Sequence, residues 1–319
     1  MKVLVDLSKI QDLNCGLGQF CLYLKPELEK LGIKAMETLP KEKDCVGFDL
    51  YHAIHQDAKI PKKIPFILTI HDLNGLYERK GLKKFFYFLK LQAKLINKRL
   101  KGLSTISQCT LEDVERTFYI PKRVFKKVIY NGTNFSQISI NKLSQQIVPS
   151  WFPINKYYFF IGTIHPKKNL ELLLGLLPYL EKKDYYIVLA GNQLYPNPYS
   201  NQFKKWKRFI LPGTVSLEEK ELLFTHNNCL GMINPSRLEG FGLPLLEAMH
   251  RRTKVFCSDI PAFREIGRDF VTYFSPTNPI DISAFETSYQ PLEEAYLYSN
   301  TFSWEKSAQN YVELYEKSL

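Results

Sequence analysis

Apolar runs alternate with longer amphipathic stretches along most of the chain. Short apolar runs bounded by turn residues predict strands, and apolar residues spaced three and four positions apart predict helices. The expected strands are Val3–Leu7, Pro65–Ile70, Phe125–Tyr130, Tyr157–Gly162, Tyr185–Ala190, Leu230–Asn234, Lys254–Ser258 and Val271–Phe274. The expected helices are Gly18–Leu31, Leu82–Lys101, Leu111–Phe118, Asn169–Glu181, Leu217–His226, Leu243–His250 and Trp304–Ser318. This alternation predicts an α/β fold of doubly wound sheets with helices on both faces.

A polar stretch at Gln137–Ser150 separates two series of strands and helices. The 319 residues are enough for two domains of ordinary size. We expect Rossmann-like domains at residues 1–145 and 146–300, and a helix at 301–319 that packs back toward the N-terminal domain. Open α/β sheets bind ligands beyond the carboxyl ends of their strands, so a cleft between two facing domains is the expected binding site.

Composition narrows the class of protein. Hydrophobic residues make up 45% of the chain, which is enough for real cores and excludes a disordered protein. No apolar run is long enough to span a membrane, and the first residues have the pattern of a strand and not of a secretory signal. Six scattered cysteines form no CxxC pair, so we expect neither a zinc site nor a disulfide framework, and a cytoplasmic location.

The net charge of +11 is concentrated in one segment, because Arg79–Lys101 holds nine basic residues and no acidic one. Aromatic and aliphatic residues fill another face of the helix expected there. We favour contact with an anionic membrane surface. A core-packed helix with a solvated basic face is the alternative, and the sequence contains no known nucleic-acid-reading motif that would support a third interpretation.

The most informative chemistry lies in the segment from Pro235 to Ala248, where Glu239 and Glu247 are separated by seven residues. Glu239 lies in a Gly-rich turn, and the helix that carries Glu247 is expected to begin near Gly242. A helix N-terminus favours anions, and carboxylates accept hydrogen bonds from hydroxyl groups. Together these features suit a polyol attached to a phosphate, such as a nucleotide sugar.

With these residues, the chain resembles the retaining glycosyltransferases of family 4, which have the GT-B fold. The resemblance extends over nearly the whole chain and rests on the joint order of several short motifs. These are Gly16-Leu-Gly18, Thr69-Ile-His71-Asp72, Ser104–Ser107, Tyr130-Asn-Gly132, Gly162–Asn169, Pro235–Ala248, Ser258–Pro261 with Glu265, and Phe302-Ser-Trp304. The N-terminal domain would be the acceptor side and the C-terminal domain the donor side.

The resemblance implies catalytic roles for His71, Glu239 and Lys168. His71 would project toward the reacting sugar, Glu239 would bind the donor sugar, and Lys168 would hold the diphosphate. Taken singly, each residue also has an ordinary structural interpretation: a core histidine, a helix-end charge and an exposed lysine. The other five histidines, among them His52 and His55, are expected to be structural.

The implied substrate-binding residues are Gly16, Gly18, Asp72, Thr163, Lys167, Phe241, Gly242, Leu243 and Glu247. Glu247 would accept hydrogen bonds from the ribose, and residues 241–243 would offer backbone amides to the sugar and phosphate. Asp72 would orient His71 or stabilise a turn. Many family members have Arg at the position of Thr163, and Lys167 would supply part of that missing charge.

The resemblance implies retaining transfer of a hexose from a nucleotide diphosphate sugar to a glycan or lipid-linked acceptor in cell-surface polysaccharide biosynthesis. No metal, other cofactor or nucleic acid is expected, and the protein would lie in the cytoplasm, peripherally on the inner face of the cell membrane. Another GT-B enzyme, such as an epimerase or a phosphorylase, remains an alternative, as does an inactive sugar-nucleotide-binding homologue.

Overall fold

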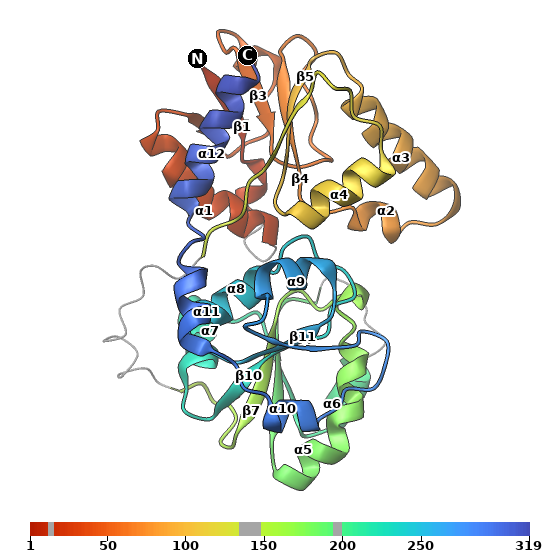
Figure 1. Ribbon diagram of the computed structural model, residues 1–319, viewed down its shortest axis with the longest axis vertical. Coiled ribbons are helices and arrows are strands. Elements are labelled where there is room, and N and C mark those ends of the chain that lie inside the picture. Colours follow the sequence, from red (N-terminus) through yellow and green to blue (C-terminus); the bar gives the residue numbers. More distant parts are fainter. Residues whose placement is uncertain (12–15, 134–147, 194–199) are drawn as a thin grey trace. The chain divides into compact units, whose positions relative to one another are not determined.

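The computed structural model describes residues 1–11, 16–133, 148–193 and 200–319. The chain forms two compact units (Figure 1). The first unit comprises Met1–Gly132 together with Phe302–Leu319, and the second comprises Thr133–Thr301. The domain boundary expected at residues 145 and 146 lies outside the described residues.

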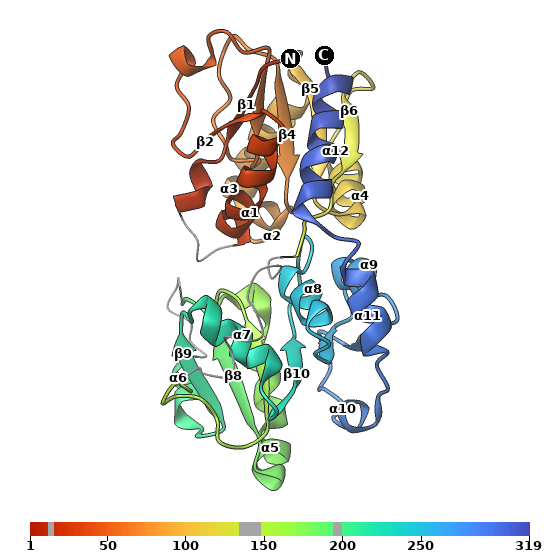
Figure 2. The ribbon, with the colours of Figure 1, turned by 90° about the vertical axis from the view of Figure 1, so that its left-hand side faces the viewer.

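The first unit is built on a six-stranded parallel sheet with the order β2-β1-β3-β4-β5-β6. Its strands are β1 (Val3–Asp6), β2 (Lys34–Met36), β3 (Leu50–Ala53), β4 (Phe66–Ile70), β5 (Leu100–Thr105) and β6 (Phe125–Val128). Its helices are η1 (Ser8–Gln11), α1 (Gly16–Lys30), η2 (Glu42–Cys45), α2 (Asn74–Tyr77), α3 (Gly81–Leu95), α4 (Gln108–Thr117) and α12 (Trp304–Lys317). Helices α1 and α12 cover one face of the sheet, whereas α3 and α4 cover the other (Figures 1 and 2).

Strand β4 shows why both faces are covered, since all five of its residues are buried. Phe66, Leu68 and Ile70 pack in one core cluster with Tyr87 and Leu91 of α3. Thr69, which alternates with them, points to the opposite face and lies 2.7 Å from the Nε2 atom of the buried His52. Because side chains alternate along the strand, β4 packs against the helices on both faces of the sheet.

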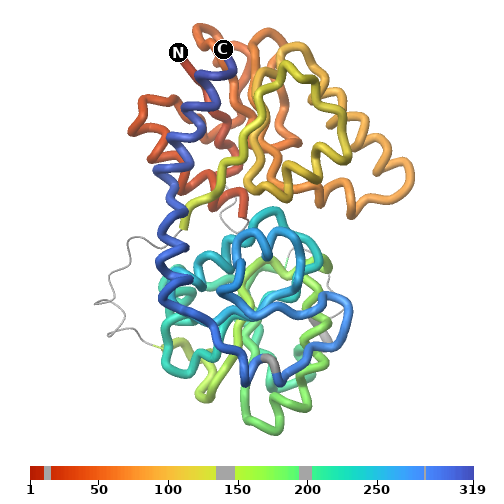
Figure 3. The backbone as a smooth tube through the Cα atoms, in the orientation of Figure 1, coloured from red at the N-terminus to blue at the C-terminus, as the bar shows by residue number. Residues whose placement is uncertain are grey.

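The C-terminal helix α12 packs within the first unit beside α1 (Figure 3). Its N-cap is Ser303, whose side chain accepts a hydrogen bond from Lys306 N. The Tyr315 hydroxyl lies 2.8 Å from His52 Nδ1, and Trp304 makes an edge-on contact with Phe20 of α1. The polar contact thus fixes the last helix to β3, and the aromatic contact fixes it to α1.

The second unit has another six-stranded parallel sheet, with the order β12-β11-β10-β7-β8-β9. Its strands are β7 (Tyr157–Ile161), β8 (Tyr186–Ala190), β9 (Phe209–Gly213), β10 (Cys229–Asn234), β11 (Val255–Ser258) and β12 (Thr272–Phe274). Its helices are η4 (Pro166–Lys168), η5 (Leu170–Leu176), α5 (Leu177–Lys183), α6 (Ser200–Lys205), α7 (Leu217–Thr225), α8 (Leu243–His250), α9 (Pro261–Gly267), α10 (Ser283–Thr287) and α11 (Leu292–Ser299).

The strand order of the second unit is that of a doubly wound nucleotide-binding sheet. Its first strand, β7, lies beside its fourth strand, β10, and the winding direction reverses between them. Loops that leave neighbouring strands at such a switch point diverge to opposite faces and leave a crevice at the carboxyl ends. The loops after β7 and β10 are therefore the place where a ligand site is expected in this unit.

The predicted α/β class with two doubly wound sheets is confirmed, but several predicted elements need correction. The helix expected at Leu82–Lys101 ends at Leu95, and residues 100–105 form strand β5, which lies between β4 and β6. The helix expected at Asn169–Glu181 is the 3₁₀ helix η5 followed by α5, and Asn169 lies before η5 in a left-handed conformation with φ of 55°. Strands β2, β3 and β9 were not predicted.

Among the described residues, none of the helices combines the length and the apolar character that crossing a bilayer requires.

Candidate active site

The turn after β7 brings backbone unusually close to the end of β8. Gly162 donates its N–H to the Ala190 carbonyl at 3.0 Å, and Gly191 follows with φ of 151°. A Cβ atom on Gly191 would lie 1.9 Å from the Gly162 carbonyl oxygen, so only glycine fits this position. The tight approach directs the chain into η4, which carries Lys167 and Lys168 at the carboxyl end of β7.

Lys168 and Glu239 meet at this edge of the sheet. The Lys168 Nζ atom lies 2.5 Å from Glu239 Oε1, and both side chains are about 15% exposed, at 15% and 14%. The Ser236 hydroxyl lies 2.7 Å from the same carboxylate oxygen. Arg237 N donates to the Lys167 carbonyl at 2.9 Å and ties the loop after β10 to η4. Two of the predicted catalytic residues, which are 71 positions apart, are therefore in direct contact.

The electrostatics of Glu239 reflect two opposing effects. Burial is the largest single effect and raises the pKa of its carboxyl group, but its charged and hydrogen-bonding neighbours, with Lys168 first, together lower the net pKa. The charge of Lys167 and the Ser236 hydroxyl act in the same direction as Lys168. Glu239 is consequently a carboxylate at neutral pH, able to accept hydrogen bonds from sugar hydroxyls.

Glu247 lies on α8 and is almost fully buried, with 1% of its surface exposed. The Lys220 Nζ atom of α7 lies 2.8 Å from Glu247 Oε1. One residue further along α7, Glu221 pairs with Arg251, where the Nε and Oε1 atoms are 2.6 Å apart. Two adjacent ion pairs thus connect α7 to α8 and fix the direction of the Glu247 carboxylate.

Lys220 was not among the predicted site residues. It precedes Glu247 by 27 positions and lies in a different helix, so no local spacing in the sequence links the two. A capping box, in which Ser216 and Glu219 exchange hydrogen bonds, sets the start of α7 and hence the position of Lys220. That capping signature is the only part of the arrangement that the sequence could have indicated.

The start of α8 is placed as the sequence predicts. The helix begins at Leu243, and its N-cap Gly242 has φ of 108°, which disfavours any residue with a side chain. Phe241 is buried beside it. A Cβ on Gly242 would also lie 3.0 Å from the Phe263 ring. The geometry thus requires glycine at position 242, and donation of amides 241–243 to a ligand remains a prediction.

Thr163 is half-buried and lies in the turn that connects β7 to η4, the short helix that carries Lys167 and Lys168. Lys167 is also half-buried, and its backbone N–H is accepted by His165 Nδ1 at 3.3 Å. Lys167 lowers the pKa of Glu239 through its charge, as noted above. Its ammonium is thus an additional positive charge near the Lys168–Glu239 pair, and its role as a replacement for the Arg of other family members stays a prediction.

His71 follows β4 in the first unit and is held as a neutral ring. Its Nε2 atom lies 2.8 Å from the Ile54 carbonyl oxygen, which can only accept, so Nε2 carries the proton. Burial lowers the pKa of His71 to about 4, despite the opposing hydrogen bond to Ile54. The Phe20 ring packs edge-on against it at 4.8 Å between ring centroids. Nδ1 is therefore a lone-pair acceptor at neutral pH.

Asp72 has a structural role in the described chain. Its Oδ1 atom accepts a hydrogen bond from Asn74 N at 2.9 Å, and Oδ2 accepts one from Asn74 Nδ2 at 2.7 Å. This arrangement stabilises the turn into α2, and substrate binding by Asp72 stays a prediction.

Gly16 and Gly18 are the first and third residues of α1. A Cβ on Gly16 would meet no atom within 4 Å, so packing alone does not require glycine there. The predicted site residues therefore form two groups. Lys168, Glu239, Glu247 and their neighbours belong to the second unit, and Gly16, Gly18, His71 and Asp72 belong to the first.

Comparison with known proteins adds independent information. A family model described as glycosyl transferases group 1 matches residues 149–316. The chain is 25% identical to the O-antigen chain mannosyltransferase RfbU of Salmonella typhimurium, over 71% of this chain and 60% of that protein. It is 30% identical to the serotype-specific mannosyltransferase WbdA of Escherichia coli, over 48% of this chain and 20% of that protein. The chain thus spans less than two thirds of the length of these relatives.

Solved structures show the same fold at low sequence identity. Sucrose-phosphate synthase from Thermosynechococcus elongatus has a TM-score of 0.74 and 13% identity, with 99% of each chain covered. Anabaena HepE in complex with UDP and glucose has a TM-score of 0.71 and 15% identity, also with 99% of each chain covered. WaaG, a glycosyltransferase involved in lipopolysaccharide biosynthesis, has a TM-score of 0.62 and 14% identity, with 99% of this chain and 97% of WaaG covered.

These likenesses establish the GT-B fold for the two sheets. The family model covers more than half of the chain, including η4, the loop after β10 and α8. The chain therefore belongs to the glycosyl transferases group 1 family.

Proposed function

We propose that the chain is a retaining glycosyltransferase that binds a nucleotide diphosphate sugar on its second unit. The observation that carries the proposal is the contact between Lys168 and Glu239 at the switch point of a doubly wound sheet. A cation suited to a diphosphate and a carboxylate suited to sugar hydroxyls lie side by side there. The buried Glu247 adds an acceptor for the two ribose hydroxyls.

The donor would bind with its diphosphate near Lys168, Lys167 and the N-terminal end of α8. Lys168 and Glu239 neutralise each other in this structure, so each holds the charge of the other in place. Because these charges are already in place, the side chains need to move less when charge develops during the reaction. The diphosphate would then share the Lys168 ammonium with Glu239.

In the proposed reaction, the acceptor hydroxyl attacks the anomeric carbon from the face that the diphosphate leaves. The bond to the diphosphate breaks, the new glycosidic bond forms, and the leaving phosphate takes the proton of the acceptor hydroxyl. Lys168 would stabilise the charge that grows on the diphosphate, and Glu239 the positive character of the sugar ring. His71, neutral and with Nδ1 unprotonated, would accept a hydrogen bond from a substrate hydroxyl.

A hexose, and specifically mannose, is the donor sugar we propose, because several relatives carry the name mannosyltransferase. The acceptor would be a glycan or a lipid-linked glycan of cell-surface polysaccharide, as the O-antigen names of two relatives suggest. Such an acceptor would place the protein in the cytoplasm, on the inner face of the cell membrane.

The test is a turnover assay with GDP-mannose and UDP-glucose, with and without lipid-linked or oligosaccharide acceptors. We expect release of the nucleoside diphosphate and a product whose anomeric configuration matches the donor, as read by NMR. Donor epimerisation would assign an epimerase, and sugar release that depends on added phosphate would assign a phosphorylase. Donor binding with neither hydrolysis nor transfer would point to an inactive homologue, which is the outcome that Thr163 favours.

A further inference from the structure

Helix α3 exposes an apolar stripe on the side opposite its core contacts. Tyr87, Leu91 and Leu95 are buried in the first unit's core. The opposite face of the helix carries four exposed apolar residues. Their exposed fractions are 74% for Leu82, 53% for Phe85, 63% for Phe86 and 44% for Leu89. Positions 82, 85, 86 and 89 follow the spacing of one helical face.

This second stripe runs against the usual distribution on a helix that covers a sheet. Such a helix normally has one apolar face against the core and polar residues toward water. Single exposed apolar residues need no explanation, but four large ones on one face form a contiguous patch, which marks an interaction surface. We call Leu82, Phe85, Phe86 and Leu89 the apolar stripe.

Basic residues flank the apolar stripe. Lys83 and Lys90 are exposed along one side of the stripe, and Lys84 is exposed in the first turn of the helix, on the face of Tyr87. None of the three pairs with a carboxylate within the part of the chain that the structure describes. The surrounding segment, 79–101, contains no acidic residue. The partner of this surface must therefore be anionic next to its apolar part.

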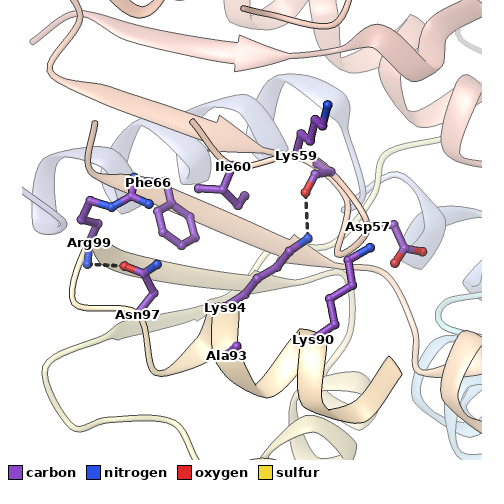
Figure 4. Close-up of a pocket in the computed structure, with 10 residues that line it drawn as sticks. Asp57, Lys59, Ile60, Phe66, Lys90, Ala93, Lys94, Asn97 and Arg99 are labelled. Atoms are coloured by element: carbon purple, nitrogen blue, oxygen red, sulfur yellow. Dashed lines mark hydrogen bonds between the residues drawn. The ribbon is translucent and has the colours of Figure 1, made fainter. Parts of the chain in front are cut away.

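A basic pocket adjoins the C-terminal half of α3 (Figure 4). Its volume is about 390 Å³, and Lys59, Lys90, Lys94 and Arg99 line it. Lys94 is already engaged, since its Nζ donates to the Gln56 carbonyl at 2.6 Å and the Ala58 carbonyl at 2.7 Å. Figure 4 shows Lys90 extending from α3 in the direction of Asp57, so Lys90 belongs both to the pocket and to the rim of the apolar stripe.

We propose that α3 docks on an anionic phospholipid bilayer, with the apolar stripe in the acyl boundary and Lys83 and Lys90 at the phosphates. A bilayer supplies an apolar interior and an anionic surface within a few ångströms of each other, which matches this arrangement. A nucleic acid offers the anions but no apolar interior for Leu82 and Phe86. The basic pocket would receive the headgroup of a lipid next to the stripe. Membrane docking itself is argued from α3 alone. Only the idea that the membrane carries the lipid-linked acceptor rests on the proposed function.

The test is co-sedimentation of the full chain with vesicles of pure phosphatidylcholine or with added phosphatidylglycerol. We expect binding to the anionic vesicles that falls as salt rises. The double variants Lys83→Glu/Lys90→Glu and Phe85→Ser/Phe86→Ser should each lower the partition coefficient at least about tenfold. Matched controls are Lys204→Glu/Lys205→Glu, two exposed lysines on α6, and Ile154→Ser, an exposed apolar residue of the second unit.

Several results would overturn the proposal. Equal vesicle binding by the wild-type chain and both variants would do so, as would the absence of binding to anionic vesicles. A dimer in analytical ultracentrifugation that Phe85→Ser/Phe86→Ser dissociates, without vesicle binding, would assign the stripe to a second copy of the chain. Nucleic-acid binding that needs the lysines but not the phenylalanines would assign the charge to a nucleic acid. Donor binding by the second unit is measured separately, so failure here leaves the proposed function intact.

Discussion

At the scale of single residues, the site is a set of charges that hold one another in place. Lys168 neutralises Glu239, and Lys220 neutralises Glu247, and all four side chains are largely buried. Removing one partner of a buried pair costs about 3–5 kcal/mol, because the other charge then remains uncompensated. Lys220 is therefore a positioning residue for Glu247, which the proposed function assigns to the ribose.

Lys220→Met should weaken binding of a nucleoside diphosphate and also remove its preference for ribose. The carboxylate of Glu247 would lose the ammonium that fixes its direction, so its hydrogen bonds to the 2′- and 3′-hydroxyls would become weaker. The measurement compares Kd values of a ribonucleoside diphosphate with those of its 2′,3′-dideoxy analogue. We expect the wild-type ratio of about tenfold or more to approach one in the variant.

A purely structural role for Lys220 would give a different pattern, in which affinity for both nucleotides falls equally and their ratio is kept. Arg252→Ala is the matched control. It removes an exposed ion pair with Glu293 in the same unit, and it should change neither the affinity nor the ratio.

The residues of this site were predictable to different degrees. Glu239, Glu247 and Lys168 lie in short segments whose order along the chain is distinctive. Lys220 and Ser236 acquire their roles only through contacts that the fold creates. The partners of His52, which are Tyr315 and Thr69, are 263 and 17 positions away, so its structural role could be assumed but its hydrogen bonds could not be predicted.

At the scale of elements, the carboxyl ends of β3 and β4 hold three histidines in neutral form. Burial is the main cause in each case, and it lowers the pKa of His52 to about 3, of His55 to about 3 and of His71 to about 4. In the unfolded chain the three histidines become protonated near pH 6.5, whereas in the folded chain they become protonated only near pH 4 or below. Stability of the first unit is therefore fully present above pH 6.5 and is lost as the pH falls below it.

His52→Gln should reduce this pH dependence. For a fully buried histidine, lowering the pH from 6.5 to 5 costs about 2 kcal/mol, at about 1.4 kcal/mol per pH unit. The variant starts from lower stability, because Tyr315 and Thr69 lose a partner, but its free energy of unfolding should fall by about 2 kcal/mol less between pH 7 and pH 5. Urea unfolding at the two pH values measures this difference. If the free energy of unfolding falls by the same amount between pH 7 and pH 5 in the variant and in the wild type, His52 does not cause the pH dependence.

Element boundaries follow from contacts that the sequence does not display. The stretch LKGLST at residues 100–105 lacks the alternation or the continuous apolar run of a strand, yet it forms β5 beside β4. Gly102 within it lies so close to α12 that an added Cβ would be 2.5 Å from Ser318 Oγ. The sequence predicted one continuous helix from residue 82 to residue 101, because lysines recur at helical spacing past residue 95.

At the scale of the whole molecule, the two units differ in strand order but have the same parallel, doubly wound architecture. The alternation of strands and helices was sufficient to predict this class. The family model matches the second unit and α12, and does not extend to residues 1–148. The first unit also carries the basic segment that accounts for most of the net charge. Our proposal accordingly places donor binding on the second unit, with acceptor selection and membrane contact on the first.

The central claim is that Lys168, Glu239 and Glu247 together bind the donor, and isothermal titration of four proteins tests it most directly. The wild-type chain, Lys168→Ala, Glu239→Ala and Glu247→Ala would each be titrated with GDP and GDP-mannose, or with the uridine pair where that binds tighter. Thermal unfolding would first establish that each variant is folded. Lys168→Ala and Glu247→Ala should weaken both ligands about tenfold to a hundredfold. Glu239→Ala should weaken only the sugar-bearing ligand, because its partner Lys168 stays available to the diphosphate. Wild-type affinity for both ligands in all three folded variants would contradict the account.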